Sequence, residues 1–378
     1  MDDKYSAINS SALSFAMPDM AMRMNKLPDG TMTAAYVFYR APKAIEFREN
    51  GVEFNVFAPD AKTVEVSGTE MTRWGEERHP LADVGDGWWR TTVKLPAGVQ
   101  FTYYFIDGVK TLYKYAPVCY AHSFVCNFVE VPDPDVDFYD FNDVPHGAVR
   151  CEYYASSYTG TLRNCWVYTP PGYEENLDKR YPVLYMLHGG GENETGWFWQ
   201  GKINFIADNL IAKGYCKEMI IVTNSGIACG KDVNESPLLP GRVDELLIND
   251  CIPFIEKRFR TISDKSFRAL CGLSMGAYQT QQICSERPGI FDYFGIFSGL
   301  RSGNYDEFLK TDAPDKFNAQ HKLLFYSAGM QEGGDKLFDE IAKMKQRGIR
   351  AEGFTCEGVH EWQTWRYAAH EFLPKLFI

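Results

Sequence analysis

The sequence predicts two domains in series, an all-β sandwich followed by an α/β domain with a mainly parallel sheet covered by helices. Residues 43–131 contain short strand-like runs separated by turns, which is typical of a β-sandwich. From residue 150 onward, continuous apolar runs alternate with segments of helical period, which is typical of a sheet buried on both faces. One of these runs ends in Gly-x-Ser-x-Gly at residues 272–276, where a strand would turn into a helix.

Length and composition exclude several classes of function. A chain of 378 residues is long for one domain, and its 45% hydrophobic share is typical of globular cores. The net charge of −11 and the lack of a Lys/Arg run argue against nucleic acid and anionic membranes as partners. Because no apolar stretch reaches the roughly 18 residues of a membrane span, we expect none. The oligomeric state stays open.

The cysteines indicate whether the chain binds a metal, and its first residues indicate in which cellular compartment it is found. The ten cysteines form no C-x-x-C pair, and the closest two, Cys119 and Cys126, lack the further ligands of a zinc site. We therefore expect free thiols, no metal and no cofactor. The first 25 residues lack a basic segment followed by an apolar one, so we expect a cytoplasmic protein, or a secreted one if a leader preceded this chain.

The β-rich half divides into three parts. Residues 1–37 show no clear period and are interpreted as an N-terminal arm. The sandwich is expected over residues 38–132, and the acidic, aromatic and proline-spaced segment 133–149 is expected to be a linker that lies on a surface. Strands of the sandwich are expected at residues 52–56, 63–66, 88–95, 100–106 and 123–131.

Four motifs of this half are Phe54-x-Val56-Phe57-Ala58-Pro59-Asp60-Ala61, Gly87-Trp88-Trp89, Leu95-Pro96-Ala97-Gly98 and Tyr104-x-Ile106-Asp107-Gly108. Together they resemble the Ig-like starch- and glycogen-binding modules, carbohydrate-binding module family forty-eight. The resemblance implies either glucan binding or a structural N-terminal domain, as found in some esterases. For Trp88 and Trp89, one ring in the sandwich core is supported at least as well as a sugar platform.

The α/β half, residues 150–378, is expected to form the second domain. Buried strands are expected at residues 182–187, 219–223, 267–271, 294–298 and 322–328, and helices at 203–212, 243–259 and 336–347. The second of these helices should bend at Pro253, because proline lacks a backbone donor and its ring clashes with the preceding turn.

Residues 272–276 have the spacing of a nucleophile elbow around Ser274. A serine on a tight, strained turn needs neighbours without bulk two residues to either side, and Gly272 and Gly276 meet this need. Its hydroxyl would stand clear of the sheet, while the Met275 N–H and the helix N-terminus would face a developing oxyanion. The alternative is an ordinary glycine-rich turn. Whether the sequence also offers oxyanion donors, a general base and an acid decides between the two interpretations.

A second glycine-rich loop follows the first buried strand, in Leu187-His188-Gly189-Gly190-Gly191. In the α/β-hydrolase plan, an N–H from such a loop joins the one after the serine. We expect Gly190 and Met275 to form the oxyanion hole, with Gly189 as the next choice. His188 is expected to be a hydrogen-bonded loop residue, because the base follows the serine in this plan.

Three histidines follow Ser274 in the chain. His370 falls in a helix-like stretch, and His321 precedes a strand, which is the wrong end for a site built on strand carboxyl ends. His360 lies in the loop 358–362, after a strand-like run. We therefore predict His360 as the general base.

The acid that orients the imidazole should follow the strand expected at residues 322–328. The loop after this strand offers Glu332 and Asp335. Asp335 directly precedes a helix and would serve as its N-cap, whereas Glu332 has no such structural task. We predict Glu332 and keep Asp335 as the competing candidate.

The α/β half also contains Tyr168-Thr169-Pro170-Pro171-Gly172-Tyr173, the run His188 to Trp197 (HGGGENETGW), Gly272-Leu273-Ser274-Met275-Gly276 and His360-Glu361-Trp362-x-x-Trp365. Together these motifs resemble carbohydrate esterase family one, the feruloyl and acetyl-xylan esterases, which are related to esterase D and the siderophore esterases. The resemblance implies Ser274 as nucleophile and His360 as base. The family's acid is usually an aspartate in a Gly-x-x-Asp turn, whereas Glu332 occupies that place here.

We therefore predict a serine esterase that acts on plant cell-wall material. The preferred substrate is a feruloylated xylo-oligosaccharide, with acetylated xylan second. The alternatives are a siderophore (enterochelin-type) esterase and, from another class, a non-catalytic glycan-binding protein. Four aromatic residues are predicted to include a wall of the substrate pocket, although a core position is about as well supported for each one. They are Trp197, Trp199, Trp362 and Trp365.

Overall fold

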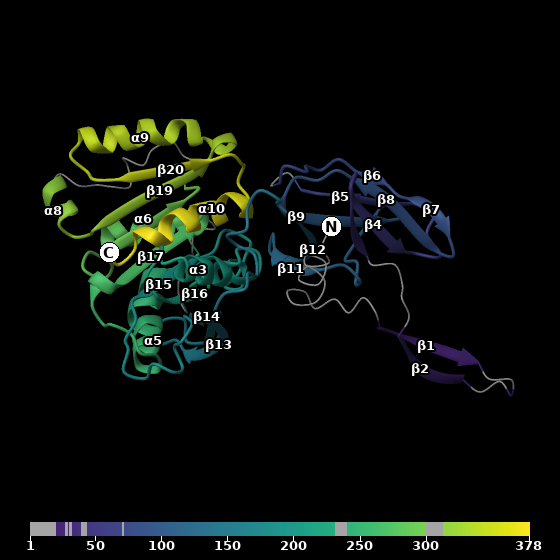
Figure 1. Ribbon diagram of the computed structural model, residues 1–378, viewed down its shortest axis with the longest axis horizontal. Coiled ribbons are helices and arrows are strands. Elements are labelled where there is room, and N and C mark those ends of the chain that lie inside the picture. The colour runs from purple at the N-terminus through teal and green to yellow at the C-terminus, as the bar shows by residue number, and fades with distance from the viewer. Residues whose placement is uncertain are drawn as a thin grey trace. The chain divides into compact units, whose positions relative to one another are not determined.

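The protein folds into two compact units in the computed structural model (Figure 1), which describes residues 20–26, 29, 32–38, 44–69, 72–230, 240–299 and 313–378. The first unit ends at Cys119 and resumes over Phe124–Asp133, and the second comprises Tyr120–Ser123 and Pro134–Ile378. Of the N-terminal arm, the described residues form an antiparallel pair, β1 (Met20–Lys26) and β2 (Met32–Phe38). The rest of the arm lies outside the described residues.

Besides the β1–β2 pair, the first unit contains two antiparallel sheets, as predicted for a β-sandwich. Their strand orders are β3-β4-β8-β7 and β11-β12-β9-β5-β6, and β10 also pairs with β9. Phe54, Val56, Val66 and Tyr104 are fully buried in the core. The strands are β3 (Ile45–Arg48), β4 (Gly51–Phe57), β5 (Val64–Ser67), β6 (His79–Pro80), β7 (Ala82–Gly85), β8 (Trp88–Val93), β9 (Gly98–Ile106), β10 (Val109–Thr111), β11 (Val118–Ala121) and β12 (Phe124–Val131).

The two adjacent tryptophans of β8 have different environments, because successive side chains of a strand point to opposite faces. Trp89 packs against the core and donates its indole N–H to the Ala58 carbonyl at 3.0 Å. Trp88 instead lies against Phe57, with ring centroids 5.2 Å apart, and Phe57 is 41% exposed. The partly buried Trp89 therefore packs on the core, and Trp88 lies beside an exposed side chain, so the sugar-platform alternative stays open for Trp88.

The second unit is built on one eight-stranded sheet with the order β13-β14-β16-β15-β17-β18-β19-β20. The strands from β16 to β20 pair in parallel, whereas β13 and β14 form an antiparallel edge that the sequence did not indicate. The strands are β13 (Ala148–Ala155), β14 (Leu162–Thr169), β15 (Val183–Leu187), β16 (Ile220–Asn224), β17 (Arg268–Leu273), β18 (Tyr293–Phe297), β19 (Leu323–Gly329) and β20 (Glu352–Cys356).

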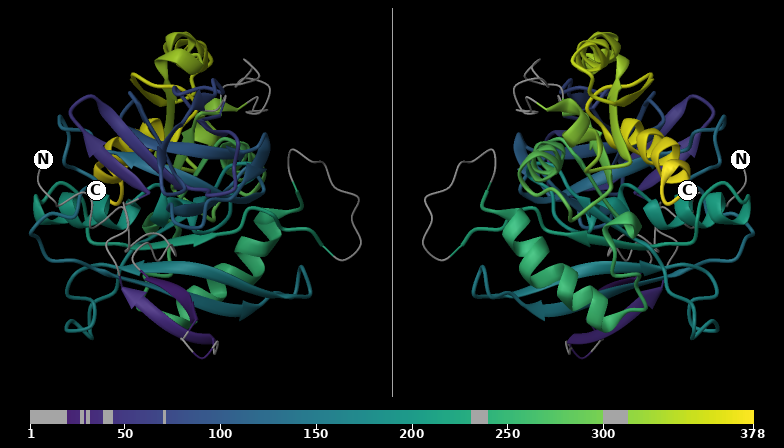
Figure 2. Two further views of the ribbon diagram at one scale, coloured as in Figure 1. Left: turned by 90° about the vertical axis from the view of Figure 1, so that its right-hand side faces the viewer. Right: turned by 90° about the vertical axis from the view of Figure 1, so that its left-hand side faces the viewer.

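Helices cover both faces of this sheet (Figures 1 and 2). Tyr185 and Val222 face the core shared with α4, α5, α6 and α9, whereas Phe297 points the other way and meets Phe372 of α10 at 5.6 Å. Helix α3 packs beside α10. The helices are α2 (Gly196–Trp199), α3 (Ile203–Ala212), α4 (Val243–Leu246), α5 (Ile252–Arg258), α6 (Met275–Glu286), α8 (Pro314–Asn318), α9 (Gly334–Gln346) and α10 (Trp362–Phe372). The mainly parallel, helix-covered sheet predicted from the sequence is confirmed.

The helix expected at residues 243–259 is divided into α4 and α5 just before Pro253, where the sequence predicted a bend. A π-helical turn, Leu247–Cys251, connects α4 to α5. Proline cannot donate to the carbonyl four residues earlier and clashes with it, and a π-helical turn widens the backbone at such a point. Before Pro253 the backbone hydrogen bonds therefore change locally from the α-helical to the π-helical pattern.

The segment predicted as a linker is anchored within the second unit from Pro134 onward. Phe138 and Asp140 are buried, and Asn209 of α3 donates to both of their backbone carbonyls at 3.0 and 2.9 Å. His146 Nδ1 lies 2.8 Å from the buried carboxylate of Asp208. The segment thus lies on the surface of the helical layer, as expected.

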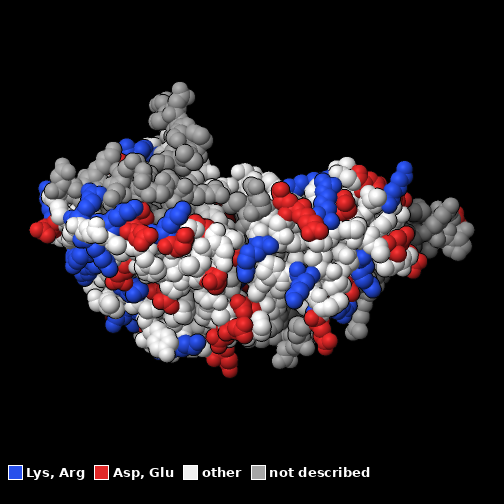
Figure 3. All heavy atoms as spheres, turned by 90° about the horizontal axis from the view of Figure 1, so that it is seen from above, with Lys and Arg blue, Asp and Glu red and all other residues white. Residues whose placement is uncertain are grey.

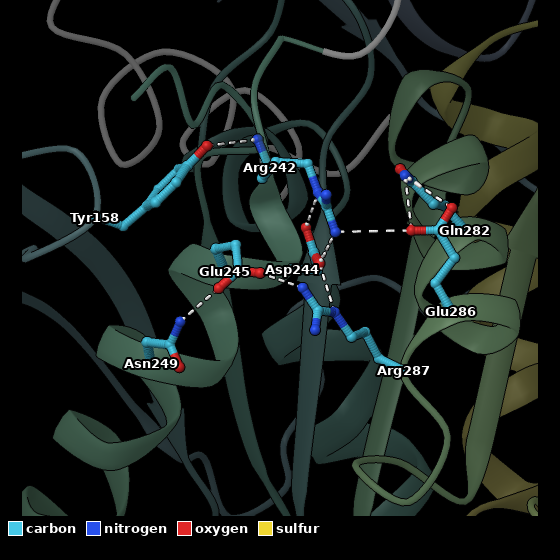
Figure 4. Close-up of polar contacts among 8 residues, drawn as sticks. All are labelled: Tyr158, Arg242, Asp244, Glu245, Asn249, Gln282, Glu286 and Arg287. Atoms are coloured by element: carbon cyan, nitrogen blue, oxygen red, sulfur yellow. Dashed lines mark hydrogen bonds and ion pairs between the residues drawn. The ribbon is translucent and has the colours of Figure 1, made fainter. Parts of the chain in front are cut away.

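A charged cluster joins the start of α4 to the end of α6 (Figure 4). Asp244 is buried and accepts hydrogen bonds from Arg242 at 2.8 and 2.6 Å and from Arg287 Nε at 2.7 Å. Burial raises the pKa of the Asp244 carboxyl, but the two guanidinium groups outweigh it and hold the pKa below its ordinary value. Arg287 also contacts Glu245, and Arg242 lies 3.7 Å from Glu286. The cluster therefore ties these two helices together.

Replacing Asp244 by Ala should lower the free energy of unfolding by about 2–3 kcal/mol, because two arginines lose their shared buried acceptor. Urea denaturation of wild type and variant measures this. Glu286→Gln is the control, since the Glu286 side chain contacts the same Arg242 but is 49% exposed, and such surface pairs contribute about 0–1 kcal/mol. Equal losses in the two variants would contradict the prediction.

Acidic and basic side chains are interspersed over the face shown in Figure 3. This mixture offers no continuous basic surface there of the kind that binds a phosphate backbone. Within the described ranges, no helix is long and apolar enough to cross a membrane.

Candidate active site

The elbow around Ser274 has the strand–turn–helix geometry that its sequence predicts. Strand β17 ends at Leu273, Ser274 adopts φ 51° and ψ −113°, and α6 begins at the next residue. A Cβ on Gly272 would lie 2.3 Å from the carbonyl oxygen of Gly276, and a Cβ on Gly276 would lie 2.7 Å from that of His188. The steric reason for both glycines is therefore confirmed.

The parallel strands bring the predicted residues to one edge of the sheet. Ser274, Ser298, Glu332 and His360 follow β17, β18, β19 and β20, which are neighbours in that order. Because carboxyl ends of parallel strands meet at the same edge, this is where open α/β sheets form their ligand sites. Ser274 is held in place by its backbone N–H, which donates to the Phe297 carbonyl at 2.9 Å.

The structure brings Glu332 and His360 together. His360 Nδ1 lies 2.6 Å from Glu332 Oε2, and the two side chains are 10% and 11% exposed. The other carboxylate oxygen accepts hydrogen bonds from Ser298 Oγ at 2.5 Å and from the Gly329 N–H at 2.8 Å. A carboxylate bonded to Nδ1 of an imidazole fixes the tautomer and the orientation of the ring. The other nitrogen, Nε2, can then accept and return a proton.

Asp335 occupies a different environment. It is exposed and lies in the first turn of α9, whose N-cap is Gly333 in the left-handed conformation. The expectation that Asp335 caps this helix is therefore wrong, because the helix begins at Gly334, two residues earlier than a cap at Asp335 would require. Its negative charge near the helix N-terminus is still favourable. In the described part of the chain, the carboxylate that contacts His360 belongs to Glu332.

The glycine loop after β15 presents Gly190 to the solvent. The Gly189 N–H donates to the buried Glu192 carboxyl at 3.2 Å, whereas Gly190 is exposed and a Cβ placed on it would meet nothing within 4 Å. This arrangement favours Gly190 over Gly189 as an oxyanion donor. Met275 is the first residue of α6, and N–H groups of a first helical turn have no acceptor within their helix.

His188 has the structural role expected from the sequence. Its Nε2 accepts a hydrogen bond from the Gly226 N–H at 3.0 Å, so its Nδ1 carries the proton and donates to the Gly189 carbonyl at 2.7 Å. Burial lowers the pKa of this imidazole, which keeps it neutral. His188 therefore joins the glycine loop to the loop that follows β16.

The other two histidines lie away from this edge. His321 precedes β19 at the opposite end of the strand, and burial lowers its pKa to about 4. His370 belongs to α10 and packs against Phe138, with ring centroids 4.4 Å apart. Both placements agree with the expectations from the sequence.

Three of the four predicted pocket tryptophans are buried. Trp197, Trp362 and Trp365 are at most 5% exposed and pack edge to face, at 5.4 and 5.1 Å, in a row that ends on His360 at 5.2 Å. Trp199 is half-buried against Trp166 at 6.2 Å. The row packs against His360 from within the fold. That one of the four lines the substrate pocket stays a prediction.

Sequence reasoning missed two residues of this edge. Ser298 is the last residue of the strand predicted at residues 294–298. A polar residue at the carboxyl end of a buried strand was the sequence feature that could have indicated a role in the site. Glu192 is a buried carboxyl inside the glycine-rich motif, where a charged residue next to three glycines was the signal. Burial raises the pKa of Glu192 to about 8, although the Gly189 N–H and the Trp362 indole lower it in part.

Glu192→Gln should flatten the pH dependence of stability between about pH 4.5 and 8, the ordinary and the raised pKa of this carboxyl. In this window the unfolded chain releases the proton that the folded chain retains, so the free energy of unfolding falls as pH rises. The slope from one group is at most about 1.4 kcal/mol per pH unit. Urea denaturation at several pH values tests this, and an unchanged slope in the variant would count against it.

The described part of the chain contains no group of three or more His, Cys, Asp or Glu residues that could hold a metal ion. Its cysteines are free thiols, and burial raises the pKa of several of them, including Cys284 and Cys356.

Comparison with known proteins supports both units. Residues 156–376 match the family model "Putative esterase", and residues 42–118 match "Carbohydrate-binding module 48 (Isoamylase N-terminal domain)". The chain is 35% identical over 345 residues to an endo-1,4-beta-xylanase/feruloyl esterase of Xylanibacter ruminicola, covering 87% of this chain and 45% of that protein. It is 29% identical to endo-1,4-beta-xylanase Y of Acetivibrio thermocellus over 39% of this chain and 14% of that protein. The chain thus spans less than half the length of these two relatives.

Solved structures give the same result for the fold. A CE1 ferulic acid esterase from Anaeromyces mucronatus in complex with ferulic acid superposes with a TM-score of 0.54 at 26% identity, covering 64% of this chain and 96% of that one. The enterobactin esterase of Shigella flexneri superposes with a TM-score of 0.59 at 13% identity, covering 89% and 96%, which shows likeness of fold alone. Because the esterase model covers more than half of the chain, this protein belongs to the esterase family and carries a feruloyl esterase-like α/β-hydrolase domain.

Proposed function

We propose that this chain is a serine carboxylic-ester hydrolase that removes feruloyl groups from xylan-derived saccharides. The observation that carries the proposal is the contact of His360 Nδ1 with Glu332 Oε2 at 2.6 Å, at the same sheet edge as the strained Ser274 elbow. A nucleophile, a base and an orienting acid that follow parallel strands of one sheet form the constellation that acyl transfer requires.

In the first half-reaction, Ser274 Oγ attacks the ester carbonyl while His360 Nε2 takes the hydroxyl proton. The carbonyl oxygen gains a negative charge, and the N–H groups of Gly190 and Met275 stabilise it. When the tetrahedral intermediate collapses, the ester C–O bond breaks and His360 returns the proton to the sugar alkoxide. The saccharide leaves, and the acyl group stays on Ser274.

In the second half-reaction, His360 takes a proton from water, and the resulting hydroxide attacks the acyl-enzyme carbonyl. The same two backbone donors stabilise the second oxyanion. Collapse of this intermediate breaks the bond to Ser274 Oγ, which regains its proton from His360. The products are a carboxylic acid and the free enzyme, and no cofactor takes part.

The relatives favour the feruloyl group over the acetyl group. The Xylanibacter protein is named an endo-xylanase/feruloyl esterase, and the Anaeromyces esterase was solved with ferulic acid. We therefore infer feruloylated xylo-oligosaccharides as the preferred substrates and acetylated xylan as the second. The match of residues 42–118 to a carbohydrate-binding module agrees with a saccharide substrate.

The test compares turnover of methyl ferulate, acetylated xylan and a catecholate siderophore ester by the same preparation. We expect the highest kcat/KM on the ferulate ester. A preference for the siderophore ester would replace the proposed substrate with that of the alternative. Failure to hydrolyse any ester, together with no labelling by a serine-directed phosphonate, would support the non-catalytic glycan-binding alternative instead.

A further inference from the structure

We propose that Ser298 is a positioning residue for ester hydrolysis, which aligns the Glu332 carboxylate with His360 through a hydrogen bond directed by the Trp365 indole. The inference deepens the proposed function and rests on it, since it concerns the same acid and base. Ser298 follows β18, the strand between those that carry Ser274 and Glu332.

The donors available to these side chains set the direction of the hydrogen bonds. Trp365 Nε1 lies 2.8 Å from Ser298 Oγ, and an indole nitrogen only donates. Ser298 Oγ therefore accepts from Trp365, and its single proton points to Glu332 Oε1 at 2.5 Å. The Gly329 N–H donates to this same oxygen at 2.8 Å. Oε1 is thus held by two donors, and Oε2 is left for His360.

The backbone of Ser298 indicates that its hydroxyl has a function. Its φ is 53°, a left-handed conformation that is unfavourable for a residue with a Cβ and natural for glycine. Strain of this kind persists where the surroundings impose it, and it concentrates at functional sites. Here the Ser298 N–H donates to the Ser327 carbonyl at 2.8 Å, and the side chain is enclosed, with 2% exposure.

Trp365 contacts both partners of this arrangement. Its ring stands perpendicular to the His360 ring, at 89° with centroids 5.2 Å apart, while its N–H holds Ser298 Oγ. The indole is 5% exposed. Because it is buried, its effect on His360 and Glu332 comes from these contacts with neighbouring side chains. One side chain therefore supports the base directly and the acid through Ser298.

The decisive variant is Ser298→Gly in the full chain, because it removes the hydroxyl and also relaxes the backbone. We expect kcat for an activated ester to fall roughly 10- to 100-fold with KM unchanged, the effect of losing one buried hydrogen bond to a charged group. Circular dichroism and thermal melting should show an intact fold. The downfield proton resonance of the His360 Nδ1–H should shift or disappear. Trp365→Phe, which keeps the ring edge but loses the N–H, should lower kcat roughly 3- to 10-fold.

The matched control is Ser327→Ala. Ser327 is a buried serine within the neighbouring strand β19, and its hydroxyl has no hydrogen-bond partner among the described residues. This variant should keep the wild-type kcat and resonance. Wild-type kcat and an unchanged resonance in Ser298→Gly, or an equal loss in Ser327→Ala, would overturn the proposal. If the wild-type chain hydrolyses no ester, the proposed function fails, and the resonance alone still decides whether Ser298 positions Glu332.

Discussion

Ser274→Ala should lower kcat on methyl ferulate by roughly 10³-fold or more, because the nucleophile and the base act as a unit and neither compensates for loss of the other. The residual rate would come from the oxyanion donors and from substrate binding, which the substitution leaves in place. Steady-state kinetics with wild type and variant measure the loss. Retained hydrolysis near the wild-type rate would remove the central claim.

Two observations separate loss of the nucleophile from loss of the fold. The Ser274 side chain caps no helix and makes no hydrogen bond that stabilises α6, so the variant should melt close to the wild-type temperature. A fluorophosphonate should label the wild-type protein once, at Ser274, and should not label the variant. Labelling at a second serine in the variant would place the nucleophile elsewhere.

Glu332→Gln should lower kcat roughly 10²- to 10⁴-fold, by analogy with other triads. The amide still fills the site and can bond to Ser298 Oγ, but it carries no charge to stabilise the imidazolium that forms on His360. Glu332 Oε2 lies 2.6 Å from His360 Nδ1, and a hydrogen bond to a charged carboxylate is about twice as strong as one between neutral groups. The kcat of the purified variant, measured with its melting temperature, tests the prediction.

Asp335→Asn is the matched control for this acid. Asp335 is exposed in the first turn of α9, so its replacement should leave kcat unchanged. It should reduce stability by only about 0.3–1 kcal/mol, the usual effect of a charge near a helix N-terminus. A large loss of kcat in Asp335→Asn with a nearly active Glu332→Gln would make Asp335 the acid.

The local parts of the site follow from the sequence, because short-range sterics determine them. A sharp turn from a strand into a helix leaves no room for side chains two residues before and after Ser274. A Cβ atom added to Gly272 or Gly276 would lie within 2.7 Å of a backbone oxygen. His360 was predicted on a different ground, its place in a loop after a strand-like run, where sites of parallel sheets form. The order of apolar runs and helical segments also predicted the parallel sheet, since buried strands need continuous apolar residues.

Other features could be decided only by the tertiary structure. Glu332 was predicted partly because Asp335 was expected to cap the following helix, and the structure shows no such cap. The local argument therefore did not establish which carboxylate contacts His360. The choice depends on the pairing of β19 with β20 and on where α9 begins. The antiparallel strands β13 and β14 were missed because their mixture of exposed and buried residues lacks a clear alternation.

The environments of the tryptophans and of Ser298 also depend on the tertiary structure. A sequence motif places Trp362 and Trp365 beside the base, but aromatic residues serve equally as core or as pocket wall. Burial depends on what the other helices and strands bring against them, and here Trp197, Phe297 and Ser298 do so from distant parts of the chain. The turn that carries Ser274 could thus be predicted from local sequence, because steric limits on a turn act over a few residues. The contact of Glu332 with His360, the hydrogen bond from Ser298 and the buried row of rings were decided by long-range strand pairing, because side chains remote in sequence meet only once the sheet has formed.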